Sequence, residues 1–217
     1  MPTLVPVLRH TRWMFLLLLG FCWSGAADAH PHVWIDYWVK AIASPQGITK
    51  LRFTWRFDKM FSVQQEADFK IVQIGPRETN LLQQKVFANL ENYHYYTYLK
   101  VDGVEFEPTK VADFTARLHG KQLEYEFTIA LPRPGQHVEI TLYDEEFFTD
   151  IGPPQGPPAV TGGSMMASAV PQYKEFVSST GEDGAIAPRC QAQQGVPRVS
   201  KMWGTFSLFV VTCQALH

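Results

Sequence analysis

The fold is decided by Val33-Trp34-Ile35-Asp36-Tyr37-Trp38-Val39, in which one side of the chain is apolar at every second residue. A second stretch, Leu51-Arg52-Phe53-Thr54-Trp55-Arg56-Phe57, alternates in the same way. A period of two is typical of strands that bury one face. Ser44-Pro45-Gln46-Gly47, between the two stretches, is a turn signal, so the sequence predicts an antiparallel hairpin.

The register of this hairpin is predicted by matching its two apolar faces. This places Val33 opposite Phe57 and Val39 opposite Leu51, because a slip by one residue would set apolar side chains against polar ones. The polar faces then pair Trp34 with Arg56 and Trp38 with Arg52, and His32 lies opposite Asp58. Cation–π contacts between these Trp/Arg pairs are expected to contribute about 0.5–1 kcal/mol each.

Further strands are expected after a helical insertion. Helices are predicted at 61–69 and 77–91, where apolar residues follow a helical spacing. The predicted strands, several joined by Asp-Gly or His-Gly turns, are 93–101, 104–106, 110–118, 122–131 and 137–143, with a weaker helix at 165–176 and a strand at 205–213. The fold class is therefore mainly β, an antiparallel sheet or sandwich with inserted helices, α+β overall.

The first 29 residues resemble a signal peptide. A charged lead with Arg9 and Arg12 precedes the apolar run 13–21, and Ala27-Asp28-Ala29 resembles a cleavage site. Phe21, before Cys22, is too bulky for a lipoprotein signal. We therefore expect residues 1–29 to be removed and the protein to be soluble in the periplasm. A β-rich domain over 30–150 and a Pro/Gly-rich loop with a C-terminal segment over 151–217 are expected to pack together.

Cleavage after Ala29 would make His30 the first residue of the mature chain. His30 then offers an α-amine and an imidazole, and His32 adds a second imidazole on the same side of an extended chain. Pro31 favours that extended conformation and, lacking an amide hydrogen, excludes the copper-chelating motif that needs one. With Asp58, the set predicts a site for Zn²⁺, or for Ni²⁺, Co²⁺ or Cu²⁺. The alternative is an N-terminal tail with ordinary exposed histidines.

Cysteines and charge narrow the class of protein. Cys190 and Cys213 remain as an even pair after export and predict a disulfide, with two free thiols or a metal pair as alternatives. A formal net charge of −2 without a Lys/Arg run argues against nucleic acid binding. The sequence shows no nucleophile motif, phosphate loop or dinucleotide fingerprint, so an enzyme is not the first expectation.

Three stretches resemble a known family, the "domain of unknown function 1007" proteins. They are His30-Pro31-His32-Val33-Trp34-Ile35-Asp36, Phe57-Asp58-Lys59-Met60-Phe61-Ser62, and the residues from Asn89 to Gly103. The resemblance covers roughly residues 30 to 150. It implies an exported bacterial protein, the periplasmic component of an ABC-type or similar transport system, encoded beside nickel/cobalt-type permeases and linked to zinc or related metals.

The expected function follows from the resemblance together with the histidines. The protein would bind a divalent transition metal, zinc first, and exchange it with an inner-membrane metal permease. One alternative is a copper-dependent redox enzyme with an N-terminal histidine brace. Another is a structural partner of a permease that binds no metal.

Overall fold

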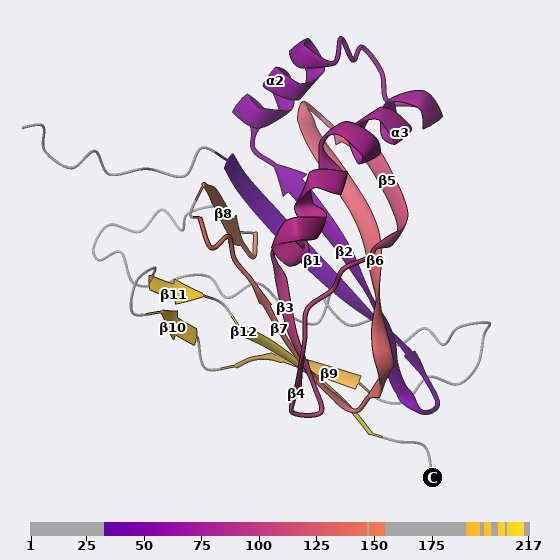
Figure 1. The fold of residues 1–217 in the computed structure, drawn as a ribbon, viewed down its shortest axis with the longest axis vertical. Coiled ribbons are helices and arrows are strands. Elements are labelled where there is room, and N and C mark those ends of the chain that lie inside the picture. Colours follow the sequence, from indigo (N-terminus) through magenta and orange to yellow (C-terminus); the bar gives the residue numbers. More distant parts are fainter. Residues whose placement is uncertain are drawn as a thin grey trace, which may run out of the picture. The chain divides into compact units, whose positions relative to one another are not determined.

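The computed structural model describes residues 33–146, 148–154, 190–195, 198–200, 204–206 and 208–214. In this part of the chain, two five-stranded sheets, two α-helices and a 3₁₀-helix surround one hydrophobic core (Figure 1). The mainly β, α+β prediction is confirmed. All the described residues belong to one compact unit. No helix among the described residues is long and apolar enough to cross a membrane.

The first sheet contains the predicted hairpin at its centre. Its strand order is β5-β6-β2-β1-β8, antiparallel except for the parallel pair of β1 and β8. The strands are β1 (Val33–Ser44), β2 (Gly47–Phe57), β5 (Ala112–His119), β6 (Gln122–Gly135) and β8 (Thr149–Gly152). Ile35, Tyr37 and Val39 are buried, whereas Trp34 and Trp38 point to the opposite face, so the alternation in the sequence does separate an inner from an outer face.

The second sheet has the order β4-β3-β7-β12-β9 and is antiparallel throughout. Its strands are β3 (Thr97–Val101), β4 (Val104–Phe106), β7 (His137–Leu142), β9 (Cys190–Gln194) and β12 (Leu208–Cys213). The Asp102-Gly103 turn joins β3 to β4 as predicted, with φ of +47° and +84°. A separate pair is formed by β10 (Arg198–Ser200) and β11 (Gly204–Phe206).

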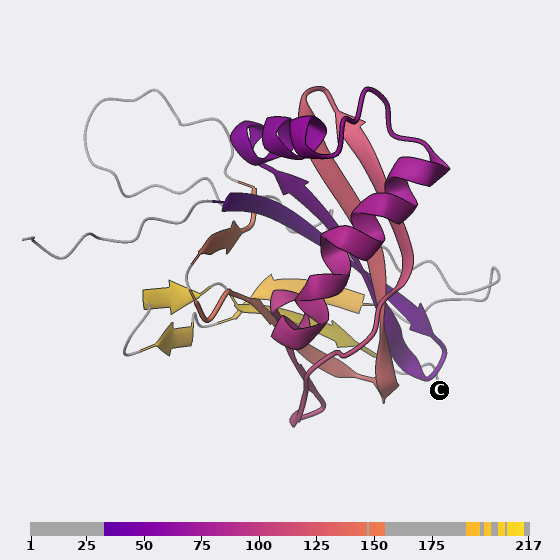
Figure 2. The ribbon, with the colours of Figure 1, turned by 45° about the horizontal axis from the view of Figure 1, so that its top comes forward.

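The helices lie between β2 and β3 in the chain and enclose one side of the core (Figure 2). They are α2 (Lys59–Asp68), α3 (Pro76–Lys85) and η1 (Phe87–Tyr96). Phe87 is the aromatic centre of this contact, because its ring lies 4.9 Å from that of Phe127 on β6 and 6.1 Å from that of Trp55 on β2. All three side chains are fully buried, so the inner face of the first sheet is covered by aromatic packing.

The expected hairpin register is wrong by two residues. Ile35, not Val33, is the partner of Phe57, and Tyr37 is the partner of Trp55. A shift of two keeps every side chain on its predicted face, and apolar matching therefore does not distinguish the two registers. The register shifts by one residue between Ile42 and Ala43, and Ser44 then pairs with Gly47 across the short turn.

The same shift changes the expected Trp/Arg contacts. The guanidinium of Arg56 lies 4.7 Å from the ring centroid of Trp38, whereas Trp38 was expected to meet Arg52 and Arg56 to meet Trp34. Asp36 is now the Cα partner of Arg56. One cation–π contact is therefore present on the outer face, with a different pairing.

The boundary between η1 and β3 also differs from the prediction. The strand expected from Tyr93 begins at Thr97, because His94, Tyr95 and Tyr96 have φ between +51° and +52°. Left-handed backbone costs an L-residue about 1–2 kcal/mol. The buried Tyr95 ring, 5.2 Å from that of Phe87, is one contact that holds this turn in place.

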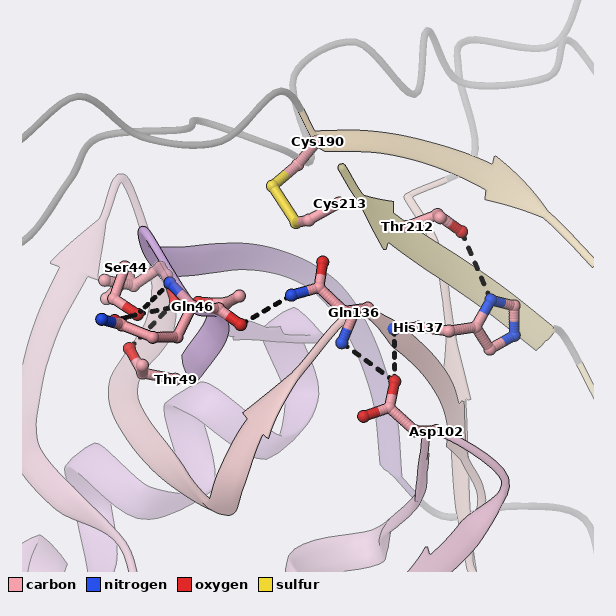
Figure 3. The surroundings of a disulfide bond; sticks show 11 residues. Ser44, Gln46, Thr49, Asp102, Gln136, His137, Cys190, Thr212 and Cys213 are labelled. Atoms are coloured by element: carbon pink, nitrogen blue, oxygen red, sulfur yellow. Dashed lines mark hydrogen bonds between the residues drawn. A yellow bond between two sulfur atoms is a disulfide. The ribbon is translucent and has the colours of Figure 1, made fainter. Parts of the chain in front are cut away.

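The predicted disulfide is confirmed between Cys190 and Cys213, which are direct partners on β9 and β12 (Figure 3). Beside it, Gln136 Nε2 donates to Gln46 O at 2.6 Å, linking the β6–β7 junction to the β1–β2 turn. Asp102 Oδ1 accepts from the backbone nitrogens of Gln136 and His137. These bonds tie the two sheets together at the end opposite to the start of β1. The predicted helix at 165–176 lies outside the described residues.

Candidate metal site

Asp58 is the one predicted metal ligand that the structure describes, and it caps helix α2. Its Oδ1 accepts hydrogen bonds from the backbone nitrogens of Met60 at 2.7 Å and Phe61 at 2.9 Å. Its Oδ2 accepts one from the backbone nitrogen of Trp34 at 3.0 Å. The half-buried carboxylate therefore joins the start of α2 to the start of β1, a role that sequence spacing alone did not predict.

His30 and His32 lie outside the described residues, so their distances to Asp58 are not determined. The expected pairing of His32 with Asp58 is wrong for the strand register, because Asp58 exchanges backbone and side-chain hydrogen bonds with Trp34 instead. Asp58 is nonetheless bonded to Trp34, the residue after Val33, and Val33 is the first described position of the chain.

Strand β8 brings a second segment to the start of β1, and this contact was not predicted. Val33 N donates to Phe148 O at 3.3 Å, and Trp34 is the Cα partner of Asp150. The loop before β8 is closed by Asp144, whose buried carboxylate accepts from the backbone nitrogens of Glu146 and Thr149, both at 3.0 Å. Two features of the sequence could have indicated this arrangement. Asp144 is a residue type that closes turns, and Thr149 and Ile151 are β-branched residues that favour a strand.

The outer face of the first sheet carries an ion cluster around Glu124. Arg56 donates to Glu124 Oε2 from Nε at 3.1 Å and from Nη2 at 2.9 Å, and Arg117 donates to Oε1. Burial by itself raises the pKa of the Glu124 carboxyl, but the hydrogen bonds and positive charges of the two arginines outweigh it and hold the pKa below its usual value. The cluster stabilises strand pairing and leaves the carboxylate without a vacant position for a cation.

Asp36, on the same face, behaves differently. Its pKa is raised because burial disfavours the charged form more than the nearby Arg56 guanidinium favours it. Arg56 is engaged by Glu124, which limits what it can contribute to Asp36.

The other described histidines lie apart from Asp58. His94 Nε2 is 3.3 Å from Glu107 Oε2, His119 is exposed at the end of β5, and His137 Nδ1 is 3.3 Å from Thr212 Oγ1. Within the described part of the chain, no three His, Cys, Asp or Glu side chains are grouped so that they could hold a metal ion. Any site that uses Asp58 therefore needs ligands from residues outside that part.

Comparison with known proteins gives a family without an assigned activity. The family model described as "Protein of unknown function (DUF1007)" matches residues 15–173. An "Uncharacterized protein" of Haemophilus influenzae is 28% identical over 123 residues, which are 55% of this chain and 59% of the relative. The chain thus spans somewhat more than half the length of that relative. No solved structure matches the chain.

Proposed function

The chain belongs to the family described as "Protein of unknown function (DUF1007)", and we propose that it is an exported periplasmic protein that binds a divalent transition metal, most favourably zinc. The ion is its cargo, which it exchanges with an inner-membrane metal permease. His30, His32 and Asp58 are the proposed ligands.

The observation that carries the proposal is the fixed position of Val33. Val33 is the residue after His32, and its backbone nitrogen bonds to Phe148 O at the end of the first sheet. The Cα atoms of consecutive residues lie about 3.8 Å apart. Val33, which follows His32 in the sequence, therefore lies at the end of the sheet where Asp58 bonds to Trp34, and this supports the proposal.

The carboxylate of Asp58 keeps capacity for an ion. A carboxylate oxygen can accept two hydrogen bonds, and Oδ2 accepts one, from Trp34 N. The cap fixes the orientation of the carboxylate, as partners of metal ligands commonly do. The exposed carboxylates of Glu146 and Asp150, which flank Phe148, add a negative potential that favours a cation.

The chemistry of the ligand set suits exchange rather than permanent storage. His30 would supply amine and imidazole nitrogens and His32 a second imidazole, which with one carboxylate oxygen makes a mixed site for Zn²⁺. Because protonated imidazole cannot bind an ion, affinity should fall as the pH drops through the histidine range.

Calorimetric zinc titration of the processed protein tests this proposal. We expect about one tightly bound ion at pH 7.5, much weaker binding at pH 5.5, and loss of the site in the variant His30→Ala/His32→Ala. The matched control is His119→Ala/His137→Ala, which removes the same number of imidazoles elsewhere and should bind like wild type. Equal binding by both double variants would overturn the histidine site.

A further inference from the structure

Exposed apolar side chains gather where β1 begins. Seven large apolar side chains are exposed among the described residues, and four of them belong to this place: Trp34, Met60, Val63 and Phe148. We call these four residues the β1 corner. Single exposed apolar residues are normal on a protein surface, but a group of this kind marks an interaction site.

Hydrogen bonds connect the elements that carry the β1 corner. The Asp58 carboxylate binds the backbone nitrogens of both Trp34 and Met60, which brings α2 against β1. Val63 follows Met60 by three residues on α2, so both side chains lie on the exposed side of that helix. The start of β1, α2 and β8 lie at one end of the first sheet in both ribbon views (Figures 1 and 2).

The charges around the β1 corner are mainly negative. Glu145, Glu146 and Asp150 are exposed on the segment that carries Phe148, and Asp150 is the Cα partner of Trp34. Lys59 is the exposed cation next to Met60 in the chain. An apolar surface with this border favours a partner that combines apolar and basic side chains and disfavours an anionic lipid surface.

We propose that the β1 corner is a docking surface for a polypeptide segment of another protein, and that this segment carries apolar side chains together with lysine or arginine. Tryptophan and methionine are enriched at interfaces, where they fill pockets of the partner. The surface adjoins the proposed metal site, but its recognition goes beyond metal binding and does not require an ion.

Photo-crosslinking of the full-length protein in its own cells tests the surface. A diazirine side chain replaces Met60 or, in a second protein, Val63; the matched controls carry it at Val72 or Val104, which are exposed and apolar but lie outside the β1 corner. We expect the first pair to join one partner protein at a segment rich in apolar and basic residues, and the controls to leave that segment unlabelled. Crosslinks to lipid, to a second copy of the chain or to an acidic segment, or labelling no stronger than in the controls, would overturn the proposal.

The crosslinked segment, made as a synthetic peptide, gives a quantitative second test in a metal-chelating buffer. Met60→Ser/Val63→Ser should weaken its binding at least about tenfold, whereas Val72→Ser/Val104→Ser should not. Replacing the basic residues of the peptide by glutamate should weaken binding to the wild-type protein. Unchanged affinity in both tests would refute the docking surface. Because no metal is present, this result leaves the metal-site proposal untouched.

Discussion

Replacing Asp58 should destabilise the metal-free protein, because its carboxylate binds three backbone nitrogens. Loss of an N-cap costs about 1 kcal/mol, and the lost hydrogen bond from Trp34 N adds about 1 kcal/mol, since that exposed strand end can be rehydrated. Asp58→Ala should therefore lower the free energy of unfolding by about 2 kcal/mol. Asp58→Asn keeps an oxygen for the cap and should cost about 1 kcal/mol.

Urea unfolding and zinc titration of the same proteins separate the two roles of Asp58. Ser62→Ala is the matched control, because buried Ser62 donates to Asp58 O at 2.6 Å and accepts from Leu123 N at 2.8 Å without touching the carboxylate. It should destabilise the protein by about 2 kcal/mol and leave zinc affinity unchanged. Both Asp58 variants should lose zinc affinity. A metal-free Asp58→Ala protein as stable as wild type would refute the capping argument, and zinc binding that tracks only stability would refute the ligand role.

Three further predictions concern the stability of the fold. The pKa of Glu124 in the folded state lies below its usual 4.5. Ionised Glu124 therefore contributes to the free energy of unfolding above that pH, and this contribution is lost as the pH falls through the folded-state pKa. When urea unfolding is measured as a function of pH, Glu124→Gln should lose less of its free energy of unfolding below about pH 4.5 than wild type does. The same pH dependence in both proteins would contradict the stabilising role of the ion cluster. Replacing both Cys190 and Cys213 by serine should lower the free energy of unfolding by about 3 kcal/mol, because the disulfide closes a loop with a sequence separation of 23. An unchanged melting temperature in thermal unfolding would contradict this. Gly47→Ala should cost about 2 kcal/mol or more, because φ is +130° and a Cβ would lie 2.7 Å from a backbone oxygen, whereas Gly103→Ala meets open space and should cost about 1 kcal/mol; equal losses in urea unfolding would argue against the close contact.

The sequence predicted the faces of the strands better than their pairing. Alternation decides which side chains are buried, and Ile35, Tyr37 and Trp55 lie on the expected face. The register depends on the turn geometry and on the bonds that Asp58 makes to Trp34, neither of which follows from a period of two. The register was therefore two residues off with every face correct.

Contacts between residues that are far apart in the sequence were the part of the candidate site that could not be predicted. The parallel pairing of β8 with β1 depends on Asp144 closing a turn more than a hundred residues after Trp34. The aromatic pattern at Tyr93 to Tyr96 resembles a strand, but three of those residues have left-handed backbone, and one of them, Tyr95, packs onto Phe87. The disulfide could be predicted because Cys190 and Cys213 remain as an even pair in an oxidising compartment once the expected export removes Cys22.

Whether export creates a metal site at His30 can be decided by measuring the mass and the bound metal of the same protein. The exported, processed protein is compared with a form that keeps one extra residue before His30, using intact mass to establish the first residue and elemental analysis to measure bound zinc. We expect the processed chain to begin at His30 and to hold about one ion, and the extended form to bind zinc far more weakly because its amine is displaced. Equal zinc content in the two forms, or none in either, would contradict this expectation.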